Sequence, residues 1–313
     1  MQTNLQETSM YDIIIIGGGP AGMTAALYAQ RNGKNALIIE KQGFGGQITY
    51  SPQVENIPGF ASVSGNAFAD AFLEQILAQG AEVELETVTS LTQKPEGFLV
   101  ETEEGGAYEA PAVILATGVQ HRLPGLPGED ELIGNGISFC AVCDGDFYKN
   151  QTVCVAGGGN SALQEAILLS SKCKKVIMLQ DLPYFTGEKK LQEVLFARDN
   201  VEAHTGVRLV SLLTQGETLQ GVEIEKEGRR EQVLCDGLFV AIGLIPKNEP
   251  FASLAALDAQ GYFDSGEDCR TRTPGLFVAG DCRKKTLRQV TTAACDGAVA
   301  AIAACRYLDE VRR

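Results

Sequence analysis

Positive charge is scarce in this sequence. Lys and Arg total 26 against 40 Asp and Glu in 313 residues, which gives a formal net charge of -14. Affinity for nucleic acid depends on clustered Lys and Arg that neutralise phosphates. The charge balance therefore argues against nucleic acid as a partner.

Histidine is also scarce, and only His121 and His204 are available as imidazole ligands. A zinc site needs four ligands, yet the chain contains a single CxxC motif, so we expect no metal site. The nine cysteines are an odd number, and the first ten residues carry no export signal. Together these features predict reduced thiols in a cytoplasmic protein, where any disulfide is expected to be catalytic.

The sequence lacks a long, purely apolar run. The most apolar stretch near the C-terminus, residues 291–308, contains Asp296 and is rich in alanine, so we expect a packed helix and no membrane span. With 44% hydrophobic residues and 35 glycines, the chain is long enough for two α/β domains, each with its own core. The composition thus predicts a soluble protein of two domains.

A pattern of strand, glycine turn, helix and strand occurs twice. The first copy runs from Ile13–Ile16 through GGGPAG to an apolar strand that ends at Glu40, and the second begins with TVCVAGGGNSA at residues 152–162. The turns read GxGxxG and GxGxxA, which are dinucleotide fingerprints. Their glycines permit a tight turn and close approach of the backbone to a pyrophosphate. A related strand follows in each copy, AVILATG at 112–118 and LFVAIGLIP at 238–246.

Candidate linkers near 118–130 and 244–250 divide the repeat into two domains. We expect residues 1–118 and 246–313 to form one discontinuous domain, with residues 119–245 inserted as a second. After the insertion, TPGLFVAGDC predicts a returning strand, and a last helix is expected to begin near Arg288. The predicted fold class is α/β, with two Rossmann-like three-layer ββα domains, the second inserted in the first.

Glu40 lies 23 residues after Gly17, at a strand end where an acidic side chain binds the adenosine ribose. Together GGGPAG, Glu40, GGQ at 45–47, VENIPG at 54–59, ATG at 116–118 and the late AGD resemble the two-dinucleotide flavoprotein disulfide reductases. The resemblance implies a tightly bound FAD, with Asp281 on its ribityl chain. The implied FAD-binding residues are Gly17, Gly19, Pro20, Ala21, Gly22, Glu40, Lys41, Gly46, Gln47, Asn56, Val88, Ala116, Thr117, Gly118, Gly280, Asp281, Arg288, Gln289 and Val290.

The CAVCDG motif at 140–145 is the sharpest local signal. A CxxC spacing brings two sulfurs within disulfide reach, and an adjacent helix start lowers the pKa of one thiol. Two inert core cysteines are the alternative, although the other seven cysteines are better candidates for such packing. Glutathione-reductase-like enzymes carry their pair just after the first acidic strand end, but residues 41–46 contain no cysteine.

Because CAVCDG precedes the second glycine turn, the chain resembles the low-molecular-weight thioredoxin reductases over almost its full length. The resemblance implies that Cys143 lies next to the flavin, that Cys140 exchanges with the partner disulfide and that Asp144 donates and accepts protons. It implies a thioredoxin-disulfide reductase that passes electrons from a donor through FAD to thioredoxin or a thioredoxin-like protein. It further implies a homodimer in which the inserted domain rotates about its two linkers.

The expected NADPH motif is missing. Typical members bind the 2'-phosphate with His-Arg-Arg after the second strand of the inserted domain and with a further Arg, but here the residues are Gln180-Asp181-Leu182 and Thr186. Three interpretations remain open. Asp181 binds the 2'-hydroxyl of NADH, which we favour; or the domain is a vestigial fold in a ferredoxin-linked enzyme; or NADPH binds through other side chains. The candidate nucleotide residues are Gly157, Gly159, Asn160, Ser161, Ala162, Gln180, Asp181, Ile242 and Gly243.

A protein of another class also fits these motifs, namely a flavin-bound redox sensor whose dithiol switches its shape. Such a sensor needs an effector surface or domain, and the sequence contains no recognisable one. The enzyme interpretation is therefore favoured.

Overall fold

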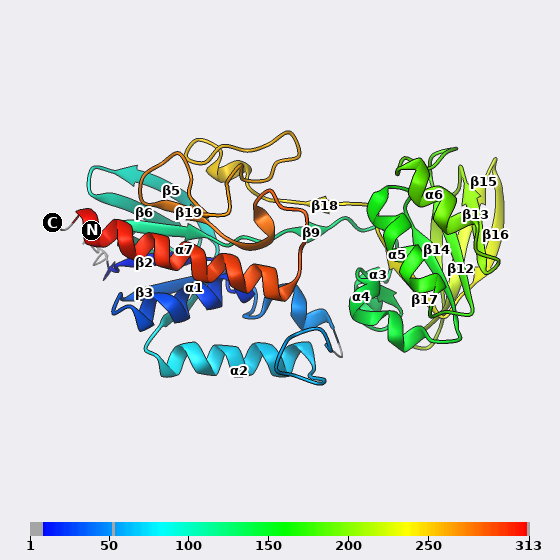
Figure 1. Cartoon of the computed structure of the whole chain (residues 1–313), viewed down its shortest axis with the longest axis horizontal. Helices are drawn as coiled ribbons and strands as arrows, with labels where there is room; N and C mark the ends of the chain where they lie inside the picture. Colours follow the sequence, from blue (N-terminus) through cyan, green and yellow to red (C-terminus); the bar gives the residue numbers. More distant parts are fainter. Residues whose placement is uncertain (1–8, 52–53, 312–313) are drawn as a thin grey trace, which may run out of the picture. The chain divides into compact units, whose positions relative to one another are not determined.

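The computed structural model describes residues 9–51 and 54–311. Contacts divide the chain into two compact units (Figure 1). The first contains the residues up to Thr49, Ser64–Gln120 and the residues from Ile245 onward, and the second contains Tyr50–Val63 and His121–Leu244. Most of the second unit is thus inserted in the first, as the sequence predicts. The first eight residues, on which the expectation of no export signal partly depends, lie outside the described residues.

A five-stranded parallel sheet lies at the core of the first unit, in the order β19-β8-β2-β3-β4. Its strands are β2 (Ile13–Ile16), β3 (Ala36–Glu40), β4 (Glu82–Leu85), β8 (Ala112–Leu115) and β19 (Leu276–Val278). The helices are α1 (Pro20–Arg31), α2 (Gly65–Ala78) and α7 (Val290–Val311). Strand β19 comes after the insertion and pairs with β8, so the last part of the chain completes this sheet.

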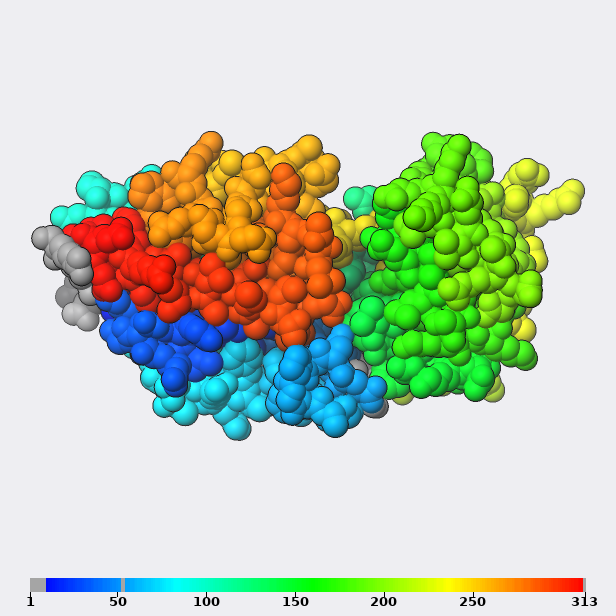
Figure 2. All heavy atoms as spheres, in the orientation of Figure 1, coloured from blue at the N-terminus to red at the C-terminus, as the bar shows by residue number. Residues whose placement is uncertain are grey.

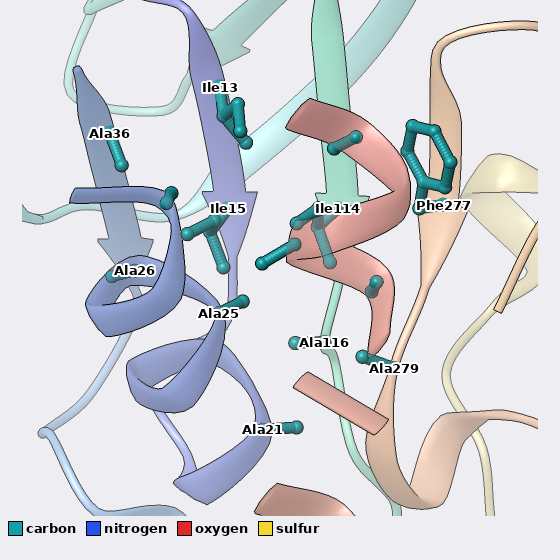
Figure 3. Close-up of a cluster of buried hydrophobic side chains, with 14 of the residues drawn as sticks. Ile13, Ile15, Ala21, Ala25, Ala26, Ala36, Ile114, Ala116, Phe277 and Ala279 are labelled. Atoms are coloured by element: carbon teal, nitrogen blue, oxygen red, sulfur yellow. The ribbon is translucent and has the colours of Figure 1, made fainter. Parts of the chain in front are cut away.

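The four isoleucines of β2 are all buried because both faces of the strand are covered. Successive side chains of a strand point to opposite faces. Ile13 and Ile15 pack with the alanines of α1 and α7, and Figure 3 shows both on the same side of the sheet as Ala25. Ile14 and Ile16 pack on the other face. An uninterrupted apolar strand of this kind is typical of a parallel sheet covered on both sides.

A second sheet covers that other face of β2. Its order is β1-β7-β6-β5, and Phe98 and Val100 of β6 are buried against the parallel sheet. The strands are β1 (Ser9–Met10), β5 (Val88–Lys94), β6 (Gly97–Thr102) and β7 (Ala107–Ala110), antiparallel except for β1 and β7. The first unit therefore has the three layers expected from the sequence: helices, parallel sheet and antiparallel sheet.

Helices α1 and α7 lie side by side (Figure 1, Figure 2). Their backbones approach closely, since a Cβ on Gly297 would lie 2.1 Å from the carbonyl oxygen of Ala21. The alanine-rich stretch 291–308 is therefore a packed helix, as predicted. Across residues 9–51 and 54–311, no helix is long and apolar enough to cross a membrane.

The second unit repeats the architecture of the first. Its parallel sheet has the order β10-β17-β11-β12-β13, and a three-stranded antiparallel sheet is packed on one face. The strands are β10 (Ile137–Ser138), β11 (Thr152–Ala156), β12 (Lys175–Gln180), β13 (Val201–Thr205), β14 (Arg208–Gln215), β15 (Thr218–Lys226), β16 (Arg229–Leu234) and β17 (Gly237–Val240). The helices are α3 (Glu129–Leu132), α4 (Ala141–Asp144), α5 (Asn160–Ser170) and α6 (Lys189–Phe196). The sequence repeat is therefore a repeat of fold.

The chain passes between the units at residues 49–50, 63–64, 120–121 and 244–245, and each of the last two passages contains a short strand. These strands, β9 (Gln120–His121) and β18 (Leu244–Ile245), pair with each other and fall within the two predicted linkers. The described part of the chain also contains the short 3-10 helices η1 (Gly46–Tyr50), η2 (Gly145–Tyr148), η3 (Glu249–Phe251) and η4 (Gly280–Cys282).

Candidate functional site

The first glycine turn joins β2 to α1, and two of its glycines are required by contacts. Gly17 has φ +114°, and a Cβ there would lie 2.3 Å from the carbonyl oxygen of Ala116. A Cβ on Gly22 would lie 1.9 Å from the carbonyl oxygen of Gly17. The helix begins at Pro20, and no side chain caps its N-terminus. Its amide groups are therefore available to a phosphate at the positive end of the helix dipole.

Glu40 ends β3 beside this turn. Its Oε2 accepts a 2.7 Å hydrogen bond from the Gly18 amide, and its Oε1 accepts a 3.0 Å bond from the Gln42 amide. A carboxylate has about four lone-pair sites. Both oxygens of Glu40 are thus fixed by the backbone and retain acceptor capacity for ribose hydroxyls, while Lys41 is exposed.

The segment after Glu40 returns to the glycine turn. The Gly45 amide donates to the Gly18 carbonyl at 2.9 Å, and a Cβ on Gly46 would lie 3.3 Å from Gly19 Cα. The Gln47 side chain donates a hydrogen bond to the Val119 carbonyl. Residues of η1 and of the segment that follows β8 therefore meet beyond the carboxyl ends of the parallel strands, where ligands bind in open α/β sheets.

Asp281 in η4 has an acceptor atom that awaits a partner. Its Oδ1 is buried and has no hydrogen-bond partner among the described residues. Burial raises the pKa of Asp281 to about 6, and the charges of Lys285 and Arg288 partly oppose this. Arg288 Nε donates to the Asp281 carbonyl at 3.2 Å, just before α7 begins at Val290. A hydroxyl group of a ligand would satisfy the orphaned oxygen.

These observations fit FAD in the first unit. The glycine cradle would accommodate a pyrophosphate, Glu40 a ribose and Asp281 a polyol chain. All of the residues expected to bind FAD lie in the first unit except Asn56, which belongs to Tyr50–Val63 and groups with the second unit. Val88 begins β5, and Gln289 donates its amide to Thr292 Oγ1 at the start of α7.

A buried cluster of charged side chains around Asp296 was not predicted from the sequence. Asp296 of α7 accepts hydrogen bonds from Arg283 Nε at 2.8 Å, Arg283 Nη2 at 2.9 Å, Lys285 Nζ at 2.8 Å and the Gly280 amide at 3.1 Å. Only 2% of the Arg283 surface and 5% of the Asp296 surface are exposed, so the pair is desolvated. The cluster fixes η4 to α7. An aspartate in an alanine-rich helix was the one signal for it.

The second glycine turn repeats the first in atomic detail. Gly157 has φ +128°, and a Cβ there would lie 2.4 Å from the carbonyl oxygen of Ala241, the counterpart of Ala116. Ala162 replaces Gly22 and is buried against Gly157. Asn160 begins α5, where its side chain bonds Glu188, while Ser161 is exposed. Ile242 and Gly243 follow β17.

Gln180 occupies in the second unit the place that Glu40 has in the first. Each residue ends its strand, and the Gln180 side chain lies against Gly158 as Glu40 lies against Gly18. Gln180 is buried, and its amide donates to the Tyr184 carbonyl at 3.2 Å. The next residue, Asp181, is exposed and accepts a 2.8 Å bond from the Leu182 amide. The strand end therefore carries a neutral side chain and then an acidic one.

Cys140 and Cys143 form a disulfide, with 5.3 Å between their Cα atoms. Cys140 is the N-cap of α4, and the Cys143 amide donates to both its carbonyl oxygen at 3.2 Å and its Sγ at 3.2 Å. Both cysteines are partly exposed, and Val142 between them is 55% exposed. The other seven cysteines are free, and all of them except Cys295 are buried. The described residues contain no group of three or more His, Cys, Asp or Glu arranged to hold a metal ion.

Asp144 follows the disulfide and is 8% exposed. Burial raises the pKa of its carboxyl, and a hydrogen bond from Ser138 partly lowers it. Ser138 Oγ donates to Asp144 Oδ2 at 2.6 Å and accepts from the Cys140 amide at 3.1 Å. Asp144 Oδ1 is buried and has no hydrogen-bond partner within residues 9–51 and 54–311. A buried acid next to a disulfide is suited to holding or releasing a proton during thiol exchange.

Comparison with known proteins agrees with this geometry. The family model for pyridine nucleotide-disulphide oxidoreductase matches residues 11–297. The thioredoxin reductase of Listeria innocua is 38% identical over 308 residues, which cover 98% of this chain and 96% of that protein. The thioredoxin reductase of Treponema pallidum is 38% identical over 306 residues, covering 96% and 98%. The crystal structure of thioredoxin reductase from Streptococcus pyogenes shares 37% identity and a TM-score of 0.90, covering 97% of this chain and 100% of that one.

Two dinucleotide folds, one of which carries a disulfide beside a buried acid, define a flavin oxidoreductase of the disulfide-exchanging class. The chain belongs to the pyridine nucleotide-disulphide oxidoreductase family. Within it, the chain is similar to low-molecular-weight thioredoxin reductases over nearly its full length.

Proposed function

We propose that this protein is an FAD-dependent thioredoxin-disulfide reductase. Residues 1–118 and 246–313 form its FAD-binding domain, and residues 119–245 form a pyridine-nucleotide-like domain that carries the dithiol. The observation that carries the proposal is the Cys140–Cys143 disulfide at a helix start, directly followed by the buried acid Asp144. Relatives at this level of identity are thioredoxin reductases, which supports thioredoxin or a thioredoxin-like protein as the substrate.

The three residues of the motif have separate roles in this proposal. Cys143 would receive electrons from bound FAD, and Cys140 attacks the disulfide of the partner to form a mixed disulfide. Cys143 then displaces the reduced partner, and the Cys140–Cys143 disulfide forms again. Asp144 supplies and removes the protons that the thiols need. Bound FAD would supply the two-electron transfer between the donor and the disulfide.

NADH is the electron donor that the residues favour. Gln180 and Asp181 stand where the ribose of the second nucleotide would lie, by analogy with Glu40 in the first unit. Neither side chain pairs with a 2'-phosphate, and Asp181 repels one, whereas a carboxylate accepts a hydrogen bond from a 2'-hydroxyl. The intact second glycine turn supports a nucleotide over a ferredoxin donor.

The test is reduction of a thioredoxin disulfide by the FAD-loaded protein with a supplied donor. Cys140→Ser and Cys143→Ser should each abolish turnover and leave FAD bound, because both sulfurs are needed for exchange. Cys295→Ser is the matched control, since Cys295 is an exposed free thiol in the first unit and should be dispensable. Full activity of the Cys143→Ser protein would show that the disulfide is structural and would overturn the proposal.

A further inference from the structure

Glu165 is a carboxylate at the dithiol that the proposed reaction does not use. It lies on α5, and its Oε2 accepts a 3.0 Å hydrogen bond from the amide of Ala141. Ala141 is buried and directly follows Cys140. A residue 24 positions further along the chain thus contacts the backbone inside the CxxC motif.

The hydrogen bond from Ala141 to Glu165 helps to hold the backbone around Cys140 in place. Helix α4 is a single turn, and the amide of its first residue, Ala141, has no partner within the helix. Glu165 supplies that partner. On the other side, the Cys140 amide donates to Ser138 Oγ at 3.1 Å. The two amides that flank the Cys140 side chain are therefore both bonded to side chains anchored outside the turn.

The surroundings of Glu165 shift the pKa of its carboxyl group. Burial raises its pKa to about 7, the bond from Ala141 opposes the rise, and the charge of Asp144 adds to it.

The elements packed on α5 bring few other charged groups close to Glu165. Strand β11 carries no ionisable side chain except Cys154, and Lys175 of β12 is paired with Glu202. The charged residues of α6 are all exposed: Lys189, Lys190 and Glu193. Beyond the turn, Lys172 is paired with Asp146. Asp144 is thus the charged group that acts on Glu165.

We propose that Glu165 is a positioning residue for the dithiol, which holds the CxxC turn on α5 and sets the proton affinity of the Cys140 thiol through its charge. The proposal rests on the proposed function in taking Cys140 and Cys143 as the redox pair. Reduction of the disulfide by two electrons and one proton leaves one thiol and one thiolate. A thiolate at Cys140 and an ionised Glu165 repel each other, so the charge of each group raises the proton affinity of the other.

The experiment measures alkylation of Cys140 against pH. The FAD-loaded protein is reduced with dithiothreitol, freed of excess reductant, treated with iodoacetamide and analysed by peptide mass spectrometry. Glu165→Gln keeps an acceptor for the Ala141 amide and removes the charge, and Glu165→Leu removes both. Glu231→Gln, an exposed glutamate on β16, is the matched control. The assay needs neither donor nor thioredoxin, so a failure to reduce thioredoxin would overturn the proposed function without affecting this test.

The wild-type profile should show an inflection near pH 7 from Glu165 in addition to the ionisation of the thiol itself. In Glu165→Gln the inflection should vanish, and the apparent pKa of the Cys140 thiol should fall by about 0.5 to 1, as expected when a nearby like charge is removed. Glu231→Gln should match the wild type. If Glu165→Gln also matches the wild type, while Glu165→Leu merely lowers the melting temperature, Glu165 is only a packing residue and the proposal is wrong.

Discussion

Ser138 Oγ donates a 2.6 Å hydrogen bond to Asp144 Oδ2, and both residues are buried beside the Cys140–Cys143 disulfide. Burial raises the pKa of Asp144, and this bond lowers it because it stabilises the ionised carboxylate. The protonation of the proposed proton donor is therefore a balance of two opposed effects, one of which a single substitution removes.

Ser138→Ala should shift the alkaline limb of the thioredoxin-reduction profile to higher pH. A step that needs protonated Asp144 is fast at low pH and is lost as pH rises through the raised pKa. Removing the bond raises that pKa further, by about 1 if it contributes roughly 1.5 kcal/mol. The measurement is kcat/KM against pH. Ser211→Ala is the control, since Ser211 bonds Glu223 elsewhere in the second unit. If the alkaline limb of the profile does not move, Asp144 is not the group that supplies the proton.

Gly22→Ala and Ala162→Gly should differ sharply although they exchange equivalent residues. A Cβ on Gly22 would lie 1.9 Å from the Gly17 carbonyl oxygen, so we expect loss of bound FAD and destabilisation of about 2 to 4 kcal/mol. Ala162→Gly relieves no clash and should cost about 1 kcal/mol, the propensity cost of glycine in a helix. Flavin absorbance and urea unfolding measure the two effects. A Gly22→Ala protein that is yellow and fully stable would contradict the contact argument.

Asp296→Asn should destabilise the first unit strongly. Asp296 is buried between Arg283 and Lys285, and removal of one partner from a buried ion cluster costs about 3 to 5 kcal/mol. Burial raises the pKa of Asp296, but the bonds from Arg283 and Lys285 outweigh this and the net shift is downward. The stabilisation is therefore present above the unfolded pKa and lost as pH falls through the lowered folded pKa.

Denaturant unfolding of the first unit between pH 7 and pH 3 measures this effect. Asp264→Asn is the control, because its pair with Lys284 is exposed and should contribute less than about 1 kcal/mol. Equal stabilities of the two variants at pH 7 would show that the buried cluster contributes no more than an exposed pair.

NADPH should be a poor donor compared with NADH. Each hydrogen bond to a charged group contributes about 1.5 to 3 kcal/mol, so the loss of two from the 2'-phosphate should weaken NADPH use by about 10² to 10⁴ fold. Anaerobic stopped-flow bleaching of the flavin by each donor measures this, and Gln180→Arg/Asp181→Arg should restore part of the NADPH rate. Wild-type reduction by NADPH as fast as by NADH would refute the argument. Reduction by neither nucleotide would favour reduced ferredoxin.

The fold could be predicted from sequence because each of its recurring motifs is a continuous stretch of the chain. Each glycine turn directly joins an apolar strand to a helix, and the matching strands β8 and β17 end at Leu115 and Val240. Four consecutive isoleucines indicate a strand that is covered on both faces. The expected βαβ units are confirmed, since β2 pairs in parallel with β3 and β11 pairs in parallel with β12.

The rest of the site depends on packing that no local pattern encodes. Glu165 reaches Ala141 only because α5 crosses the short helix α4, and Asp296 meets Arg283 only because α7 folds back over η4. Asn56 was expected with the FAD-binding residues but groups with the second unit. The ligand roles of the individual residues stay predictions.

The late position of β19 has a consequence for the growing chain. Residues 276–278 leave the ribosome after the whole of the second unit, which ends at Leu244. Until then β8 has an unpaired edge, and the face of the sheet that α1 and α7 share is covered by α1 alone. The inserted unit can therefore fold during synthesis while the first unit waits for β19 and α7. A polypeptide halted before β19 would present that open edge to other chains, which makes premature termination an aggregation hazard.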